Sequence, residues 1–266
     1  MNSQPAVELH RLSKGFPRSR RVAGTPWWRR STDQLIALHP LDLRLEAGAT
    51  LGVIGPNGSG KSTLVRILAT LILPDGGWAR VFGHDVVRDS LSVRRHVNRV
   101  SVEAAFFKEL SPWENLAFAA RLYGDDGVSL RSRVQQVLAR LGLPRDFVDR
   151  PLRQLSRGQQ QKVAIARSLL TSPALLLMDE PTTGLDPRSK REVQALVQEL
   201  RRDRAITTLL CTHDLEEAEI LCDRVVLMDQ GRVLADGTPE RLGSLEELFF
   251  RLSGRALADA DQEEIA

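Results

Sequence analysis

The chain has 266 residues, of which 42% are apolar and 27% are charged, so it can bury a core of ordinary size. Its net charge of +3 is too small to indicate nucleic-acid binding, and its two cysteines exclude a disulfide scaffold. No apolar run approaches the roughly 20 residues that span a bilayer, and a reducing cytoplasm is the expected compartment.

The first part of the chain alternates β-rich and helical segments, which favours an α/β fold. A helix is predicted over residues 62–72, where Pro74 would stop it. The predicted strands of this part are residues 7–12, 35–45 and 50–54.

A basic stretch separates the first two predicted strands. Residues 11–32 contain seven basic residues and no acid, together with Trp27 and Trp28. Paired tryptophans beside arginines are typical of a contact with an anionic lipid surface or a partner. The alternative is a solvated hairpin at the surface.

A helical region follows in the middle of the chain. Ser111, Pro112 and Glu114 form the pattern of a capping box with proline at the first helical position. A second amphipathic helix is predicted to end at Gly142. These features predict a small all-helical insertion at about residues 104–157.

The remaining residues return to alternating strands and helices. Residues 174–178 are a fully apolar run without alternation, as a strand buried on both faces requires, and residues 206–211 are predicted to form the next strand. Residues 225–236 are predicted to form a hairpin around Gln230 and Gly231. The predicted helices are residues 158–170, a segment with Val193, Leu196, Val197 and Leu200 on one face, and a last helix with a capping box of Ser244 and Glu247.

The strongest motif is GPNGSGKST, which fits the pattern G-x-x-x-x-G-K-[ST] between a predicted strand and a predicted helix. Its glycines let backbone N–H groups surround a phosphate, and the helix N-terminus favours the same anion. Lys61 would add a charge for the β- and γ-phosphates, and Ser62 a hydroxyl ligand for Mg²⁺. The predicted contacts are Gly55, Pro56, Asn57, Gly58, Ser59, Gly60, Lys61, Ser62 and Thr63.

Two acids end the apolar strand in LLLMDEP, at the sheet edge where ligands of such folds collect. Asp179 is predicted to bind Mg²⁺, directly or through water. Glu180 is predicted to orient and deprotonate an attacking water. His213 follows the next strand and is predicted to reach the γ-phosphate from the same edge. The alternative is a strand-end turn with solvated acids and a structural histidine.

A second turn, LSRGQQQKV, also has the composition of a phosphate-binding helix N-terminus. It carries Ser156 and Gly158 with Arg157 between them. One chain with two such turns raises the question of what the second turn binds.

The chain resembles the ATPase subunits of ABC transporters over about residues 7–237. The resemblance rests on GPNGSGKST, LSRGQQQK, LLLMDEP, TGLD and the Thr212–His213 pair, in that order and spacing. It implies a P-loop NTPase (RecA-like) core with an antiparallel β subdomain and an inserted all-helical subdomain. The implied divisions are a cassette at 1–240, with its helical subdomain at about 104–157 and a basic insertion at about 17–34, and a short helix with an acidic tail at 241–266.

The resemblance also implies a head-to-tail dimer with ATP and Mg²⁺ between its subunits, in which the second turn of one copy covers the γ-phosphate of the other. The implied contacts to the partner's ATP are Ser156, Gly158, Gln159 and Asp186. Hydrolysis would use Glu180, His213 and Lys61. The implied partners are a second ATPase subunit and an integral-membrane permease, at the cytoplasmic face of the cell membrane, and no nucleic acid.

Two positions depart from the family pattern. Val102 stands where the family has a glutamine, and the following Glu103 is predicted to substitute as a metal or water ligand, the alternative being a surface acid. Phe16 is predicted to stack on adenine, although Trp27 or Trp28 could do so instead.

The leading functional hypothesis is the ATP-hydrolysing subunit of an exporter for a drug, polysaccharide or lipid. A single cassette with a short tail favours export over import, since importers often append a regulatory domain. The alternatives are an importer ATPase, a soluble ABC-type ATPase acting on ribosomes or DNA, and an unrelated phosphate-loop kinase or GTPase.

Overall fold

A computed structural model of the protein describes residues 4–21, 30–101, 106–125, 127–203 and 206–254. Its centre is a six-stranded sheet that is parallel except for one edge strand, β10, which pairs antiparallel with β9. In spatial order the strands are β10 (Arg232–Gly237), β9 (Arg224–Asp229), β3 (Thr50–Ile54), β8 (Thr207–Thr212), β7 (Leu175–Asp179) and β6 (Val97–Ser101).

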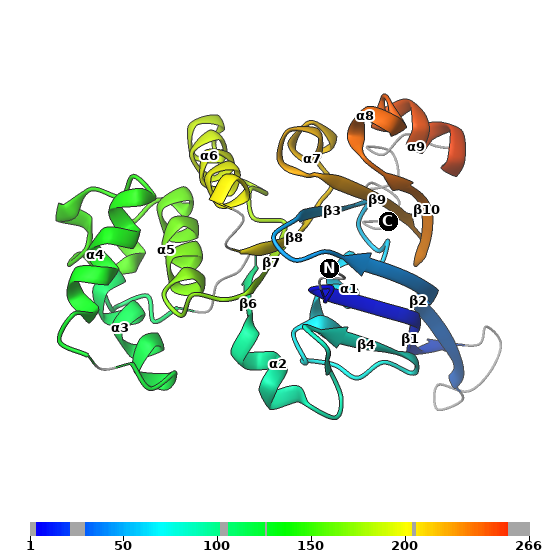
Figure 1. The fold of residues 1–266 in the computed structure, drawn as a ribbon, viewed down its shortest axis with the longest axis horizontal. Helices are drawn as coiled ribbons and strands as arrows, with labels where there is room; N and C mark the ends of the chain where they lie inside the picture. Colours follow the sequence, from blue (N-terminus) through cyan, green and yellow to red (C-terminus); the bar gives the residue numbers. More distant parts are fainter. Residues whose placement is uncertain (1–3, 22–29, 102–105, 126, 204–205, 255–266) are drawn as a thin grey trace.

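A second, antiparallel sheet lies beside the first (Figure 1). Its long strands β1 and β2 pair from Val7↔Leu45 to Arg21↔Arg30, whereas β4 follows β1 only as far as Ser13↔Gly76. Its strands, in spatial order, are β2 (Arg30–Leu45), β1 (Val7–Arg21), β4 (Gly76–Val81) and β5 (His84–Asp85).

The basic insertion expected at residues 17–34 is therefore not separate from the strands in the part that is described. Residues 17–21 and 30–34 continue β1 and β2 as a two-stranded ribbon beyond the rest of the sheet. The predicted strand limits at residues 12 and 35 were wrong because this ribbon has no hydrophobic alternation. Trp27 and Trp28 lie outside the described residues.

Two hydrophobic clusters cover the two faces of the central sheet. Side chains alternate along a strand, and β7 shows this directly. Leu175 and Leu177 belong to the cluster shared with the antiparallel sheet, while Leu176 and Met178 belong to the cluster shared with the helical region. All four side chains are fully buried, as predicted for a strand covered on both faces.

The helical region forms one end of the molecule (Figure 1). The predicted capping box is confirmed, because the Ser111 hydroxyl accepts from the Glu114 N–H and the Glu114 carboxylate accepts from the Ser111 N–H. Helices α3, α4 and α5 contact one another here. The elements are α3 (Pro112–Leu122), α4 (Leu130–Arg140), the 3₁₀ turns η1 (Arg145–Phe147) and η2 (Leu152–Gln154), and α5 (Arg157–Leu169).

The remaining helices connect strands, except α8 and α9, which follow the last strand. Helix α1 ends at Leu68 instead of residue 72, because Thr70 adopts a left-handed conformation with φ 58° and terminates the helix before Pro74. These helices are α1 (Lys61–Leu68), α2 (Ser90–His96), α6 (Pro187–Asp203), α7 (Leu215–Leu221), α8 (Pro239–Leu242) and α9 (Leu245–Ser253). No helix in the described part of the chain combines the length and apolar character needed to cross a membrane.

The predicted hairpin is confirmed as β9 and β10. Its turn has Gln230 at φ 46° and Gly231 at φ 73°, as a two-residue hairpin turn with two positive φ angles requires. The Gly231 N–H donates to the Ser59 carbonyl at 3.0 Å. The hairpin turn therefore supports the loop between β3 and α1.

Candidate functional site

The loop between β3 and α1 is formed by glycines that no other residue could replace without strain. Gly58 and Gly60 have φ angles of 72° and 103°. A Cβ on Gly55 would lie 2.1 Å from the Met228 carbonyl oxygen, so the hairpin strand β9 approaches the loop too closely for any side chain.

Gly55→Ala is therefore expected to displace the loop and lower nucleotide affinity by more than about tenfold. The measurement is titration with a fluorescent ATP analogue, together with the melting temperature. Gly127→Ala is the matched control, because a Cβ there meets nothing closer than 3.7 Å. Unchanged nucleotide affinity in Gly55→Ala would contradict a tight fit at this position.

Lys61 begins α1 and is buried, although it is charged. Its Nζ donates to the carbonyl oxygens of Gly55 at 2.6 Å and Pro56 at 2.9 Å. The same ammonium lies 3.7 Å from Glu180 Oε1. The loop thus folds around a cation that is held close to the end of β7.

Ser62 and Asp179 form the second contact between the loop and β7. The Ser62 hydroxyl donates to Asp179 Oδ1 at 3.0 Å. Burial raises the pKa of Asp179 above its usual value, and the Ser62 hydrogen bond opposes that shift. A hydroxyl and a carboxylate oxygen converge here, which are the ligand types that Mg²⁺ accepts.

Glu180 follows β7 in a strained conformation, with φ 51° in the left-handed region. Its backbone N–H donates to the Cys211 carbonyl at 2.9 Å, and its Oε2 accepts from Thr183 Oγ1 at 3.0 Å. His213 Nδ1 lies 3.4 Å from Oε2. Hydrogen bonding to His213 is the largest cause that lowers the pKa of Glu180 to about 2, with Lys61 adding to it against the effect of burial.

Phe16 lies at the mouth of the same site. A pocket of about 220 Å³ is lined by Phe16, by Leu35 and Ile36 of β2, by the loop, and by Glu180. Leu35 and Ile36 are about half exposed, so the pocket has an open apolar side. The structure brings together the aromatic ring, the loop and the acid that the sequence predicted to act on one nucleotide.

The second turn is the N-terminus of α5. The Ser156 hydroxyl accepts from the Gln159 N–H at 3.2 Å, and the Gln159 side chain accepts from the Ser156 N–H at 2.8 Å. This reciprocal pair is a capping box, S-x-x-Q, and it was not predicted from the sequence LSRGQ.

Gly158 and Arg157 connect this turn to the start of α6. A Cβ on Gly158 would lie 2.2 Å from Ser189 Oγ, and a Cβ on Gly184 would lie 2.7 Å from the Arg157 guanidinium. The Asp186 carboxylate accepts from the backbone N–H groups of Arg188 and Ser189. None of the four residues predicted to contact a partner's ATP lines the pocket around the loop.

Comparison with known proteins decides the family. The family model described as ABC transporter matches residues 38–183, which is more than half of the chain. The chain belongs to the ABC transporter family. Its fold and motifs are those of the ATP-hydrolysing cassette of that family.

Similar curated proteins include ATP-binding proteins named for drug resistance and others named for methionine import. The daunorubicin/doxorubicin resistance ATP-binding protein DrrA of Streptomyces peucetius is 42% identical over 246 residues, which are 92% of this chain and 69% of that protein. The doxorubicin resistance protein DrrA of Mycobacterium tuberculosis is 36% identical over 229 residues, 86% of this chain and 69% of that one. The methionine import protein MetN of Xanthomonas oryzae pv. oryzae is 39% identical over 235 residues, 87% and 66% of the two chains.

Solved ABC structures have the same fold. A dimeric ATP-binding cassette in a post-hydrolysis state, bound to ADP and Pi, has a TM-score of 0.74 and 26% identity, and the match covers 87% of this chain and 98% of that one. The cbiO1 protein of Clostridium perfringens, part of the ABC transporter complex cbiONQ, has a TM-score of 0.75 and 25% identity, covering 98% and 100% of the two chains.

The structure adds one acid at this ABC site that sequence reasoning missed. Glu217 of α7 is fully buried and bonded to Thr182 and Thr212. Its signal in the sequence is slight, since it is one of three glutamates in the exposed-looking run LEEAE. Glu103, the predicted substitute for the family glutamine, lies outside the described residues.

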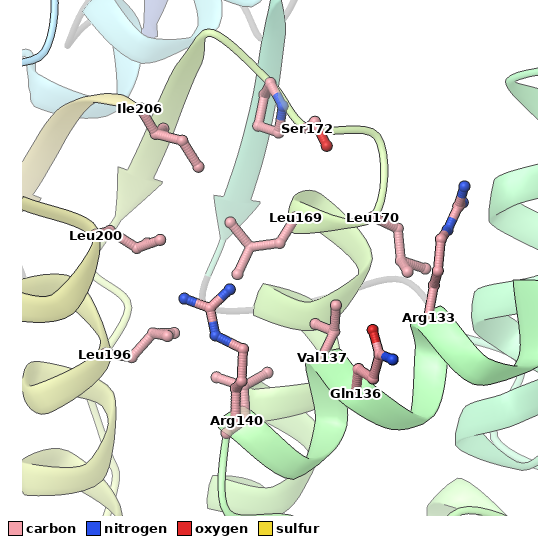
Figure 2. A pocket seen from close by; sticks show the side chains of 12 residues that line it. Arg133, Gln136, Val137, Arg140, Leu169, Leu170, Ser172, Leu196, Leu200 and Ile206 are labelled. Atoms are coloured by element: carbon pink, nitrogen blue, oxygen red, sulfur yellow. The ribbon is translucent and has the colours of Figure 1, made fainter. Parts of the chain in front are cut away.

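A further pocket, of about 400 Å³, lies between α4, the end of α5, and α6 (Figure 2). Its apolar wall includes Leu169 and Leu196, while Arg140 reaches across it and pairs with Glu199 of α6 at 2.7 Å. It shares no lining residue with the pocket around the phosphate loop. This second pocket therefore belongs to the junction of the helical region with the core.

Proposed function

We propose that this protein is the ATP-hydrolysing subunit of a membrane exporter. The observation that carries the proposal is the convergence of Lys61, Glu180 and His213 between the phosphate loop and the carboxyl ends of β7 and β8. A cation, an acid and a histidine at one sheet edge suit the binding and hydrolysis of a nucleoside triphosphate.

The nucleotide would lie in the pocket along the loop. Phe16 of β1 stacks on the base, and the backbone N–H groups at the start of α1 bind the phosphates. Lys61 leaves the carbonyl oxygens of Gly55 and Pro56 to bind the β- and γ-phosphates as a point charge.

Mg²⁺ fits the Ser62 and Asp179 pair. The two oxygens already approach each other at 3.0 Å, and Mg²⁺ commonly uses one or two protein oxygens plus phosphates and waters. When bound, the ion would neutralise charge on the phosphates. The described residues contain no group of three or more His, Cys, Asp or Glu that would form an all-protein cage.

Glu180 is the proposed general base and His213 its partner. Glu180 Oε1 and Oε2 face Lys61 and His213 respectively, so the γ-phosphate would enter between the carboxylate and its two neighbours. Glu180 then accepts a proton from the attacking water, and His213 orients the phosphate.

The second turn is proposed to serve the ATP of a partner copy. The residues of the second turn do not line the pocket of their own chain, which supports this arrangement. The turn is also a helix N-terminus, which favours an anion, and its Gly158 packs closely against Ser189. The Ser156 hydroxyl uses an acceptor lone pair for the Gln159 N–H, and its proton can donate to an anion.

Mixing two variants tests the shared site. In a dimer of one Ser156→Ala copy and one Lys61→Ala copy, one pocket would carry both defects and the other neither. We expect the mixed dimer, purified through two different tags, to trap ATP in one pocket, whereas each variant homodimer traps far less. Equal, low trapping in all three dimers would show that Ser156 acts on the ATP of its own chain.

A groove beside β6 is the proposed contact for the permease. It has a volume of about 600 Å³, and its lining residues include Arg94, Arg99, Leu122 at the end of α3 and the following Tyr123. Leu122 and Tyr123 are 72% and 62% exposed and form an apolar part of this groove. An amphipathic permease segment would bury them and place the protein at the cytoplasmic face of the membrane.

Export is proposed because two DrrA proteins named for daunorubicin or doxorubicin resistance are among the similar proteins. The chain spans about two thirds of the length of these relatives. The proposed cargo is a drug, a polysaccharide or a lipid. The test is affinity purification from native membranes. A polytopic exporter permease should copurify and should be lost with Leu122→Asp but retained with Glu219→Ala, an exposed residue elsewhere.

The similarity to MetN keeps import as the second candidate. The same purification separates the two functions, because an importer permease comes with a substrate-binding protein. Recovery of no membrane protein at all would contradict both.

A further inference from the structure

Glu217 is a buried carboxylate with two specific partners. The side chain of this α7 residue has no exposed surface. Thr182 Oγ1 donates to its Oε1 at 2.8 Å, and Thr212 Oγ1 donates to its Oε2 at 2.7 Å. Each carboxylate oxygen therefore holds a hydroxyl from a different segment of the chain.

A buried acid at this place needs a reason, because removing a carboxylate from water is unfavourable unless hydrogen bonds replace the lost hydration. Burial raises the pKa of Glu217, and the two threonine hydroxyls oppose that shift. An apolar residue would fill the same helix position, beside the fully buried Ala218 and Leu221, without this cost.

The two threonines are next to the proposed reacting groups. Thr182 lies two residues after Glu180 in the turn that leaves β7, and Thr212 immediately precedes His213 at the end of β8. Glu217 thus bridges the two segments that carry the Glu180–His213 pair.

Glu180 needs such support because of its backbone. A glutamate in the left-handed region is strained and persists only where the surroundings determine it. The contacts that hold the segment include the hydrogen bond from the Glu180 N–H to the Cys211 carbonyl, the one from the Thr183 hydroxyl to Glu180, and the one from Thr182 to Glu217.

We propose that Glu217 is a positioning residue for ATP hydrolysis, whose carboxylate fixes the ends of β7 and β8 so that Glu180 and His213 face one γ-phosphate. Glu217 itself touches neither ATP nor water in this role. The inference rests on the proposed assignment of Glu180 as the base.

Glu217→Ala is expected to lower kcat for ATP hydrolysis about tenfold to a hundredfold, because a small misplacement of reacting groups has effects of this size. The KM for ATP and the affinity for a fluorescent ATP analogue should stay within about twofold, since the phosphate loop is unchanged. If Glu217 had only a structural role, the variant would have a lower melting temperature but would not combine a lower kcat with an unchanged KM.

Glu217→Gln is the rescue variant. Its oxygen accepts from one threonine and its amide donates to the other hydroxyl, so both bridges survive. We expect kcat within several-fold of the original protein. Glu219→Ala, on the exposed side of the same helix, is the matched control and should leave kcat and KM unchanged.

Thr182→Val and Thr212→Val give a second approach if Glu217→Ala does not fold. Each replaces a hydroxyl by a methyl group of similar shape and removes one bridge, and each should lower kcat at unchanged KM. The inference is overturned if the variants that fold keep full kcat, or if kcat and ATP affinity fall together. Glu180→Gln tells the failure of the proposed base apart from the failure of the positioning role. If Glu180→Gln is fully active, Glu180 is not the base. If Glu180→Gln is inactive but Glu217→Ala is fully active, only the positioning role of Glu217 is wrong.

Discussion

Glu180→Gln is expected to lower the rate of ATP hydrolysis by about 10² to 10⁴, the range that general-base catalysis contributes. The amide keeps the shape and the hydrogen bond from Thr183 but cannot take a proton from water. Because the phosphate loop and Lys61 are untouched, ATP binding should persist. The variant should then accumulate as an ATP-bound dimer, measured by size-exclusion chromatography with and without ATP beside a phosphate-release assay.

Glu216→Gln is the control for this change, because Glu216 is an exposed acid on the nearby helix α7. It should hydrolyse ATP at the original rate and form no stable dimer. If Glu180→Gln turned ATP over normally, another group would have to be the base.

Lys61→Ala is expected to weaken ATP binding by about tenfold to a hundredfold, and to reduce hydrolysis at least as much. A charge-assisted hydrogen bond contributes roughly 1.5–3 kcal/mol, which is a change of this size. The substitution also leaves the carbonyl oxygens of Gly55 and Pro56 without their donor and Glu180 without its nearest cation. Isothermal titration with a non-hydrolysable ATP analogue measures the affinity.

Lys108→Ala removes the same charge from an exposed position in the helical region and should bind ATP normally. Binding of ATP to Lys61→Ala at the original affinity would mean that the ammonium does not reach the phosphates. A variant that binds poorly because it is unfolded would be recognised by its melting temperature.

The fold was predictable wherever packing left a pattern in the sequence. The predicted strands at residues 174–178 and 206–211 agree with β7 and β8 within one residue. For β7 the signal is the uniformly apolar run that a strand covered on both faces requires. Strand β4 was missed because it begins with Gly76 and Gly77, which weaken any strand signal. The outer part of the β1–β2 ribbon was missed because its sequence has no hydrophobic alternation.

The site was predictable where the chemistry is local and less so where it depends on the tertiary fold. The glycines of the loop, with Lys61 and Ser62, form one contiguous motif. The approach of His213 to Glu180 required only that two neighbouring strands end at one edge. Nothing in the sequence indicated that Glu217 turns inward, because its partners Thr182 and Thr212 lie on separate segments. The contact of the Arg157 guanidinium with Gly184 was equally hidden.

The contacts of Glu180 have a consequence for the end of each reaction cycle. Its carboxylate holds Lys61 on one oxygen and His213 on the other, the same two groups that a γ-phosphate would attract. The γ-phosphate and the Glu180 carboxylate would therefore compete for the same two side chains, Lys61 and His213. When the cleaved phosphate departs, the nearest anion left to take them back is Glu180. Under the proposed assignment the site would reset itself, and each turnover would end in the arrangement from which the next begins.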